Sequence, residues 1–273
     1  MHQPTYIERF DEPRRLLDAD PEVAAALAAR GAAIASGAPT GAATAAGLAA
    51  GGAFALAALS RDVYAQGGLP GIVVDVLNFA LTLEHLEADF YTTGVGTTGL
   101  IPADMTDAFD QIRRHEVAHV AFLRGVLGAR AIPTPTFDFT GGGAFADVFR
   151  NGRTFAALAQ TFEDTGVRAY KGQAANLMGR PDVLTSALRI HSVEARHAAK
   201  VRRMRGQKGW ITGDSRGDLP AAAAGTYQGE ANTFHFILGQ PDHHTQAQTE
   251  AFDETLTKDQ VLKIVRPFIT GAR

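Results

Sequence analysis

The 273-residue sequence predicts an all-α protein built around a four-helix bundle, with a long crossover between the second and third helices. Between residues 71 and 206, apolar residues recur at helical spacing in four stretches, separated by loops that contain glycine or proline. The first and third loops are short and therefore join antiparallel neighbours. The second loop, residues 129–146, has about 18 residues, which at ~3.3 Å per residue is enough to run the length of the bundle.

Glycine and proline mark the ends of the four helices. Proline is tolerated in the first helical turn, where its missing N–H has no intrahelical partner, and glycine commonly ends a helix. The expected helices run from Gly71 to about Tyr91, from Pro102 to Gly128, from about Ala146 to Gly179 and from Pro181 to Gly206.

Composition excludes several classes of protein. The chain has no cysteine, so disulfides, iron–sulfur clusters and thiolate zinc sites are ruled out. Its formal charge of −3 gives no indication of nucleic-acid binding. Any metal must therefore be held by carboxylate and imidazole groups, which suit iron, manganese or zinc better than copper(I).

Three segments are expected: residues 1–66, the bundle at 67–206, and an extension at 207–273. The first segment has two interpretations. It contains parts of an export signal, namely Arg14-Arg15, an apolar run over residues 44–59 and a small-x-small site at Val63-Tyr64-Ala65. Because acidic residues separate these parts, we favour a retained Ala/Gly-rich arm and a cytoplasmic rather than an exported protein. The run is too rich in alanine and glycine for an integral membrane span.

The C-terminal extension, residues 207–273, has one recognisable helix signal. Thr257 and Gln260 form a capping pattern that precedes a short apolar helix from Val261 to about Arg266. We expect this extension to pack on the bundle or on a second copy of it.

Two Glu-x-x-His pairs carry the chemistry. The pair Glu194 and His197 stands 78 residues after Glu116 and His119, and a lone glutamate precedes each pair by 31 or 32 residues. Residues at i and i+3 share a helix face, and an unpaired carboxylate inside a bundle is very costly. Four helices with this order of ligands can hold two metal ions. The candidate ligands are Glu84, Glu116, His119, Glu163, Glu194 and His197.

The spacing also suggests how the ligands are shared. Glu116 and Glu194 are expected to bridge two divalent transition-metal ions, iron or manganese, while the lone glutamates are terminal ligands and each histidine binds one ion. The spacing alone leaves Glu87 open as a replacement for Glu84, because the two lie at i and i+3. Any single Glu-x-x-His pair also occurs on ordinary solvated helices, so the prediction depends on the two pairs together.

Aromatic and imidazole neighbours have weaker signals. Tyr91 follows Glu84 by seven residues and is either a core aromatic or a catalytic residue that bonds a ligand carboxylate or takes part in one-electron chemistry. Tyr170, seven residues after Glu163, is expected to be a core aromatic. The flanking histidines are expected to point to other helix faces; they are His85, His115 and His191.

These residues give the chain a family resemblance. Residues 76–91, 115–119, 162–167 and 191–197 resemble the ferritin-like superfamily, and more closely the bacterial ferritin-like domain proteins related to plant desiccation-related proteins. The resemblance covers residues 71–206 well, 207–273 loosely and 1–66 poorly. It implies a ferritin-like bundle with a metal site, and it selects Glu84 over Glu87 as the ligand of the first helix. Members of this family are often exported with a twin-arginine signal.

Two functions follow as expectations. The first is a di-metal protein that performs redox chemistry with dioxygen or peroxide, as a ferroxidase, peroxidase or catalase-like enzyme. The second is a structural, stress- or desiccation-protective protein whose metal site stabilises the bundle. In either case we expect a monomer or homodimer, because long extensions at both ends would crowd the contacts of a cage.

Overall fold

The computed structural model describes residues 68–234 and 246–272. The expectations for residues 1–66, the retained arm and the export signal, lie outside the described residues. Residues 68–273 form one compact unit, and the fold of this unit is described below.

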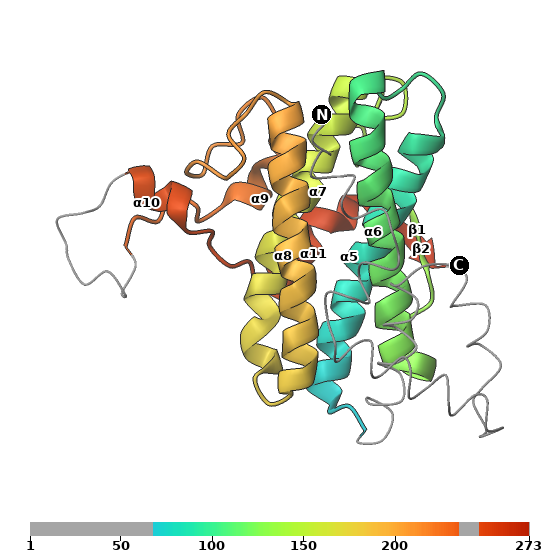
Figure 1. Cartoon of the computed structure of the whole chain (residues 1–273), viewed down its shortest axis with the longest axis vertical. Helices are drawn as coiled ribbons and strands as arrows, with labels where there is room; N and C mark the ends of the chain where they lie inside the picture. Colours follow the sequence, from blue (N-terminus) through green and yellow to red (C-terminus); the bar gives the residue numbers. More distant parts are fainter. Residues whose placement is uncertain (1–67, 235–245, 273) are drawn as a thin grey trace, which may run out of the picture. The chain divides into compact units, whose positions relative to one another are not determined.

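Four long helices make up the bundle, as the sequence predicts (Figure 1). Apolar side chains at helical spacing face inward on each of them, and this burial is what holds the helices together. No helix among the described residues is both long and apolar enough to cross a membrane. The four helices are α5 (Gly71–Gly96), α6 (Ala103–Leu127), α7 (Gly152–Gln173) and α8 (Pro181–Met204).

The bounds of the first and third helices differ from expectation. The first helix continues five residues past Tyr91, because Thr92 and Thr93 are compatible with a helix. The third begins at Gly152 rather than near residue 146, because the Asn151 side chain caps it by accepting a hydrogen bond of 3.0 Å from Arg153 N. A 3₁₀ turn, η2 (Ala174–Leu177), extends the end of this helix.

The crossover connects two helices that begin at the same end of the bundle. A Cβ atom at Gly152, the first residue of α7, would lie 2.5 Å from the Leu100 carbonyl oxygen, just before α6. Since α6 and α7 start together, the chain must return along the whole bundle between them (Figure 1). This is the connection that the short–long–short loop pattern predicts.

The crossover also contains a strand that the sequence did not reveal. After η1 (Gly128–Arg130), strand β1 (Pro135–Phe137) pairs antiparallel with β2 (Ile269–Ala272) at the C-terminal end. Thr136 lies opposite Gly271, and the register shifts between Thr136 and Phe137. The fold is all-α apart from this two-stranded ribbon.

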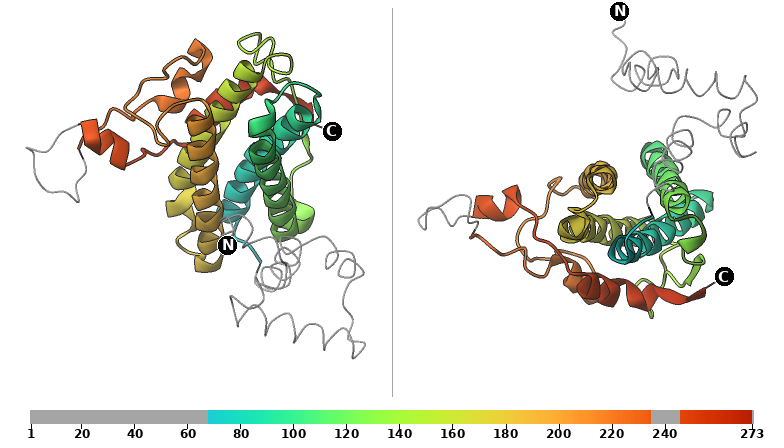
Figure 2. Two further views of the ribbon diagram at one scale, coloured as in Figure 1. Left: turned by 45° about the horizontal axis from the view of Figure 1, so that its top comes forward. Right: turned by 90° about the horizontal axis from the view of Figure 1, so that it is seen from below.

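The C-terminal extension packs on its own bundle. Its helix α11 begins at Lys258, three residues before the expected start, because Thr257 and Gln260 complete a capping box. Val261, Val265 and Phe268 then enter the bundle core, and Figure 2 shows this segment crossing the face formed by α5 and α7. The elements of the extension are η3 (Ala221–Ala223), α9 (Ala224–Tyr227), α10 (Gln246–Ala251), α11 (Lys258–Val265), η6 (Arg266–Phe268) and β2.

Aromatic rings fill the core beside the candidate site. Phe90 and Phe155 are fully buried and stack with ring centroids 4.6 Å apart. A Cβ atom at Gly94 would lie 2.1 Å from the Phe155 ring, so only glycine lets α5 approach α7 this closely. Truncating such a ring typically costs about 3–5 kcal/mol. The packed rings therefore hold α5 and α7, the two helices that carry the lone glutamates, at a fixed spacing.

Candidate metal centre

All four helices contribute to one buried cluster. Glu84 lies on α5 and Glu163 on α7, while α6 and α8 each contribute a Glu-x-x-His pair. The four glutamate side chains are fully buried, and the two histidines are buried or nearly so. The structure thus brings together all six residues that the sequence predicts: Glu84, Glu116, His119, Glu163, Glu194 and His197.

The six residues form two overlapping sets of four. In each set, one potential ligand atom per residue lies within 4.8 Å of the others. Glu116 and Glu194 belong to both sets. The remaining members are Glu84 with His119 in one set, and Glu163 with His197 in the other. This sharing is the arrangement expected of two bridging carboxylates.

Distances within the sets suit ligands around a common ion. His119 Nδ1 lies 3.0 Å from Glu84 Oε2, 3.0 Å from Glu116 Oε2 and 3.3 Å from Glu194 Oε1. His197 Nδ1 lies 2.8 Å from Glu116 Oε1 and 3.4 Å from Glu163 Oε2. Ligand atoms bound at about 2.1 Å and at right angles to one another lie about 3 Å apart, so these separations leave room for an ion.

Several polar atoms of the cluster have no hydrogen-bond partner in the protein. They include Glu163 Oε2 and both oxygens of Glu194. His197 Nδ1 and Glu116 Oε1 are close, yet their directions do not make a hydrogen bond. Buried polar groups are normally satisfied, and a cation in each set would satisfy these. The residues therefore fit two divalent metal ions.

The pKa values show how unusual the environment is. Burial raises the pKa of Glu84 to about 7, and burial with the charge of Glu116 raises that of Glu194 well above its ordinary value. Burial lowers the pKa of His197, but Glu163 and Glu116 outweigh it and raise the pKa to about 11. Burial opposes ionisation of Glu116, yet the hydrogen bond from His119 and the charges of His119 and His197 lower its pKa overall. Without metal, protons on the histidines thus offset part of the carboxylate charge.

Two tyrosines connect the helices that carry the lone glutamates through hydrogen bonds. Tyr91 on α5 donates a 2.6 Å hydrogen bond to Glu163 on α7, and Tyr170 on α7 donates one to Glu84 on α5. Burial and the adjacent Glu163 raise the pKa of Tyr91, so its hydroxyl keeps its proton. The interpretation of Tyr170 as merely a core aromatic was incomplete, because it contacts a candidate ligand as directly as Tyr91 does.

His115 is a neighbour of the cluster, and its expected orientation was wrong. Its ring stacks on His197 with centroids 5.1 Å apart, and its Nδ1 lies 2.8 Å from His197 Nε2. Burial and the charge of His197 lower the pKa of His115 to about 4, so it remains neutral and can accept this hydrogen bond. The overlooked signal is that His115 and His119 lie at i and i+4, on one side of α6.

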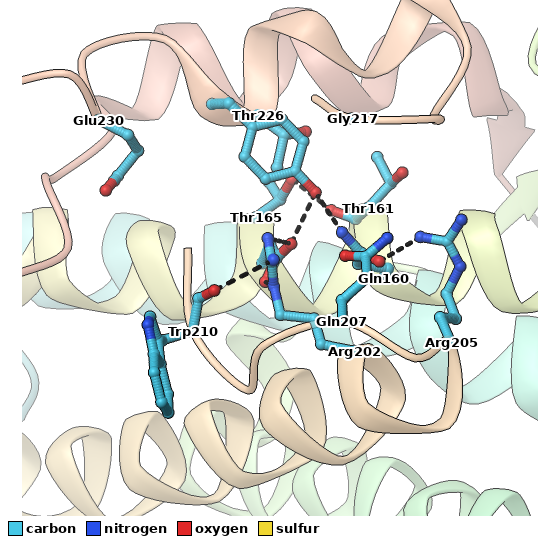
Figure 3. A network of polar contacts seen from close by, with 12 residues as sticks. Gln160, Thr161, Thr165, Arg202, Arg205, Gln207, Trp210, Gly217, Thr226 and Glu230 are labelled. Carbon is cyan, nitrogen blue, oxygen red and sulfur yellow. Dashed lines mark hydrogen bonds and ion pairs between the residues drawn. The ribbon is translucent and has the colours of Figure 1, made fainter. Parts of the chain in front are cut away.

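A buried polar network lies behind the cluster and was not predicted. Arg202 binds the Asp164 carboxylate with two hydrogen bonds of 2.8 and 2.5 Å, and Tyr227 donates a 2.6 Å hydrogen bond to the same carboxylate. Figure 3 shows Arg202 also reaching the Trp210 carbonyl, 3.3 Å away. Because Asp164 directly follows Glu163, this network ties the ligand-bearing turn of α7 to α8.

A four-helix bundle with this crossover and a buried Glu/His cluster fits the class of di-metal carboxylate proteins. Comparison with known families agrees: the model of the ferritin-like domain matches residues 72–207. The chain belongs to the ferritin-like superfamily. No curated protein matches the chain.

Proposed function

We propose that this protein binds two iron or manganese ions between its four helices and performs redox chemistry with dioxygen or peroxide. The observation that carries the proposal is the shared position of Glu116 and Glu194 in both sets of candidate ligands. One metal would need one set of four, whereas two overlapping sets with two common carboxylates suit a pair of bridged ions. When bound, such a pair would exchange electrons with dioxygen or peroxide.

The protein would hold each ion by one terminal carboxylate, one imidazole nitrogen and the two shared carboxylates. His119 Nδ1 and His197 Nδ1 are the nitrogens that face the carboxylates. With Nδ1 of His197 on an ion, its Nε2–H is directed at His115 Nδ1, which fixes the ring. The four glutamates are fully buried, so the protein would also exclude bulk water from the reaction.

Tyr91 is the residue that we assign to proton handling. Its hydroxyl holds a proton 2.6 Å from Glu163 Oε1, and it is fully buried beside Phe90 and Phe155. A protonated phenol in this position can donate a proton toward the centre or, as a redox-active side chain, give up an electron. Tyr170 makes the equivalent contact with Glu84 and provides a matched comparison.

The proposal is tested by metal analysis and activity together. Protein purified without chelators, and stripped protein re-supplied with iron(II) or manganese(II), should contain about two ions per chain. The loaded protein should consume dioxygen or peroxide faster than a Glu116→Gln/Glu194→Gln variant. Less than about one ion per chain, with none regained, would contradict the proposal.

A protective, non-catalytic role is the second candidate, and the complete burial of the four glutamates favours it. In that case the ions would act as ties between helices, and no substrate would need access. The two candidates separate in one comparison. If Glu116→Ala and Glu194→Ala lower the melting temperature while the loaded parent already consumes neither dioxygen nor peroxide, the protective role is correct.

A further inference from the structure

Glu87, which the spacing left open as a replacement for Glu84, is a buried carboxylate outside both sets of candidate ligands. It lies one turn after Glu84 on α5 and is 3% exposed. Other buried carboxylates have cationic partners: Asp164 pairs with Arg202, and Glu230 pairs with Arg168. Within residues 68–234 and 246–272, no basic side chain forms an ion pair with Glu87. The four carboxylates of the candidate centre, in contrast, lie beside His119 or His197.

The surroundings of Glu87 are the centre itself. Burial raises the pKa of Glu87 well above its ordinary value, and the next largest causes are the charges of the four candidate glutamates, beginning with Glu194. A void of about 10 Å³ lies beside Glu87 and Gly166, so at most about one water could reach the carboxylate there. So little water leaves an ionised Glu87 poorly solvated, and a buried charge is very costly without a cation nearby.

Gly166 shows that the helix opposite has made room for Glu87. A Cβ atom at Gly166 would lie 3.4 Å from Glu87 Oε1 and 3.1 Å from Glu194 Oε2, so both carboxylates press against the same point of α7. Gly166 follows Glu87 by 79 residues, the offset that also relates Glu84 to Glu163. The two half-repeats of the bundle are α5 with α6 and α7 with α8. At equivalent positions of these half-repeats, α5 carries a glutamate and α7 carries no side chain.

The tyrosine contacts show where Glu87 and Gly166 lie along the contact between α5 and α7. Tyr91 reaches Glu163 and Tyr170 reaches Glu84, so α5 and α7 run antiparallel with these pairs at either end of the contact. Glu87 and Gly166 fall between the two pairs, where the half-repeats meet. A Cβ atom on α7 at that meeting point would be in close contact with Glu194 and in ordinary contact with Glu87, so glycine leaves this space to the two carboxylates.

We propose that Glu87 is a fifth carboxylate of the centre, which lies on the α5–α7 side near Glu194 and turns toward the two ions when they bind. This rests on the proposed function, because it requires the two ions. Four ionised glutamates balance two divalent ions, whereas five match one divalent and one trivalent ion. The fifth carboxylate therefore suits metals with an accessible trivalent state, such as iron and manganese, better than zinc or calcium.

The test measures manganese(II) binding to the stripped full-length protein, and it needs no catalysis. The number of ions and their dissociation constants are obtained by calorimetry and from the electron paramagnetic resonance signal of unbound manganese. We expect the parent to bind two ions. In Glu87→Gln, the dissociation constant of at least one ion should rise roughly ten- to one-hundred-fold, the range found when groups around a metal are removed.

A swap of the two positions tests the geometry directly. Glu87→Gly should weaken binding as Glu87→Gln does, and the double variant Glu87→Gly/Gly166→Glu should recover most of the loss by supplying the carboxylate from α7. Glu250→Gln is the matched control, because Glu250 is a partly exposed carboxylate that pairs with Lys208 and belongs to neither set of candidate ligands. Circular dichroism establishes that each variant is folded.

The possible failures are distinguishable. If the parent binds two ions and Glu87→Gln binds them with the same dissociation constants, Glu87 is not part of the centre, and the proposed function is untouched. If the parent binds none, the proposed function fails, and this inference fails with it. If the double variant does not fold, the nearly isosteric Glu87→Gln still decides the question.

Discussion

The two kinds of glutamate in the centre should respond differently to the same substitution. Glu116 belongs to both sets of ligand atoms, whereas Glu84 belongs to one. Changing Glu116 to glutamine should therefore weaken the binding of both ions, while changing Glu84 to glutamine should weaken the binding of only one. Glutamine keeps the shape of the side chain and removes its charge, so packing is disturbed as little as possible.

The size of the effect can be worked out for thermal stability. An ion present at 100 times its dissociation constant stabilises the native state by about 2.7 kcal/mol. In a domain of roughly 200 residues, each kcal/mol moves the melting temperature by about 2–4 °C, so each ion contributes roughly 5–10 °C. Saturating manganese should thus raise the melting temperature of the parent by about 10–20 °C, that of Glu84→Gln by about half as much, and that of Glu116→Gln very little.

Scanning calorimetry with and without manganese(II) measures these increments directly. Glu163→Gln should match Glu84→Gln, because the two occupy equivalent positions, and the control variant Glu250→Gln should match the parent. Equal increments in Glu84→Gln and Glu116→Gln would refute the shared role of Glu116. No increment in the parent would refute metal binding at this site.

Three further results are expected. Tyr91→Phe should reduce peroxide or dioxygen consumption by the loaded protein more than Tyr170→Phe does, and equal activities would remove the special role of Tyr91. Each variant leaves a buried carboxylate without one hydrogen-bond donor and should cost about 1–3 kcal/mol of stability. The pKa values of Glu84, about 7, and His197, about 11, are raised in the folded protein, so the stability they give is present at low pH and is lost as pH rises. Between pH 5 and 9 the melting temperature of stripped protein should therefore fall while manganese affinity rises, because binding displaces these protons; parallel trends would contradict this. Arg202→Met should cost about 3–5 kcal/mol in chemical denaturation, because it leaves a buried carboxylate without its cation, and a loss below about 1 kcal/mol would show that the pair is not needed.

The bundle was predictable because its signals are local. Apolar periodicity, prolines at helix starts and glycines at helix ends identify the four helices, and loop lengths then determine the connection. The ribbon of β1 and β2 was not predictable, because two very short strands separated by over a hundred residues leave no local pattern. The start of α7 was missed because Asn151 competes with the apolar pattern that begins earlier.

The candidate site shows the same division. The six candidate ligands could be picked out because i, i+3 pairs repeat at a fixed offset, which is visible in one dimension. The contacts that surround them join distant positions: His115 meets His197, and Asp164 meets Arg202. Such pairings depend on which helix faces meet. The spacing of residues along the sequence does not determine how packed helices are rotated relative to one another.

Anomalous scattering from a crystal of the full-length protein, supplied with iron and manganese and measured at both absorption edges, tests the central claim most directly. We expect two peaks about 3.5–4 Å apart, the usual separation in two-metal sites, lying between Glu116 and Glu194 with one histidine beside each. A well-ordered crystal without an anomalous peak among the six residues would contradict it.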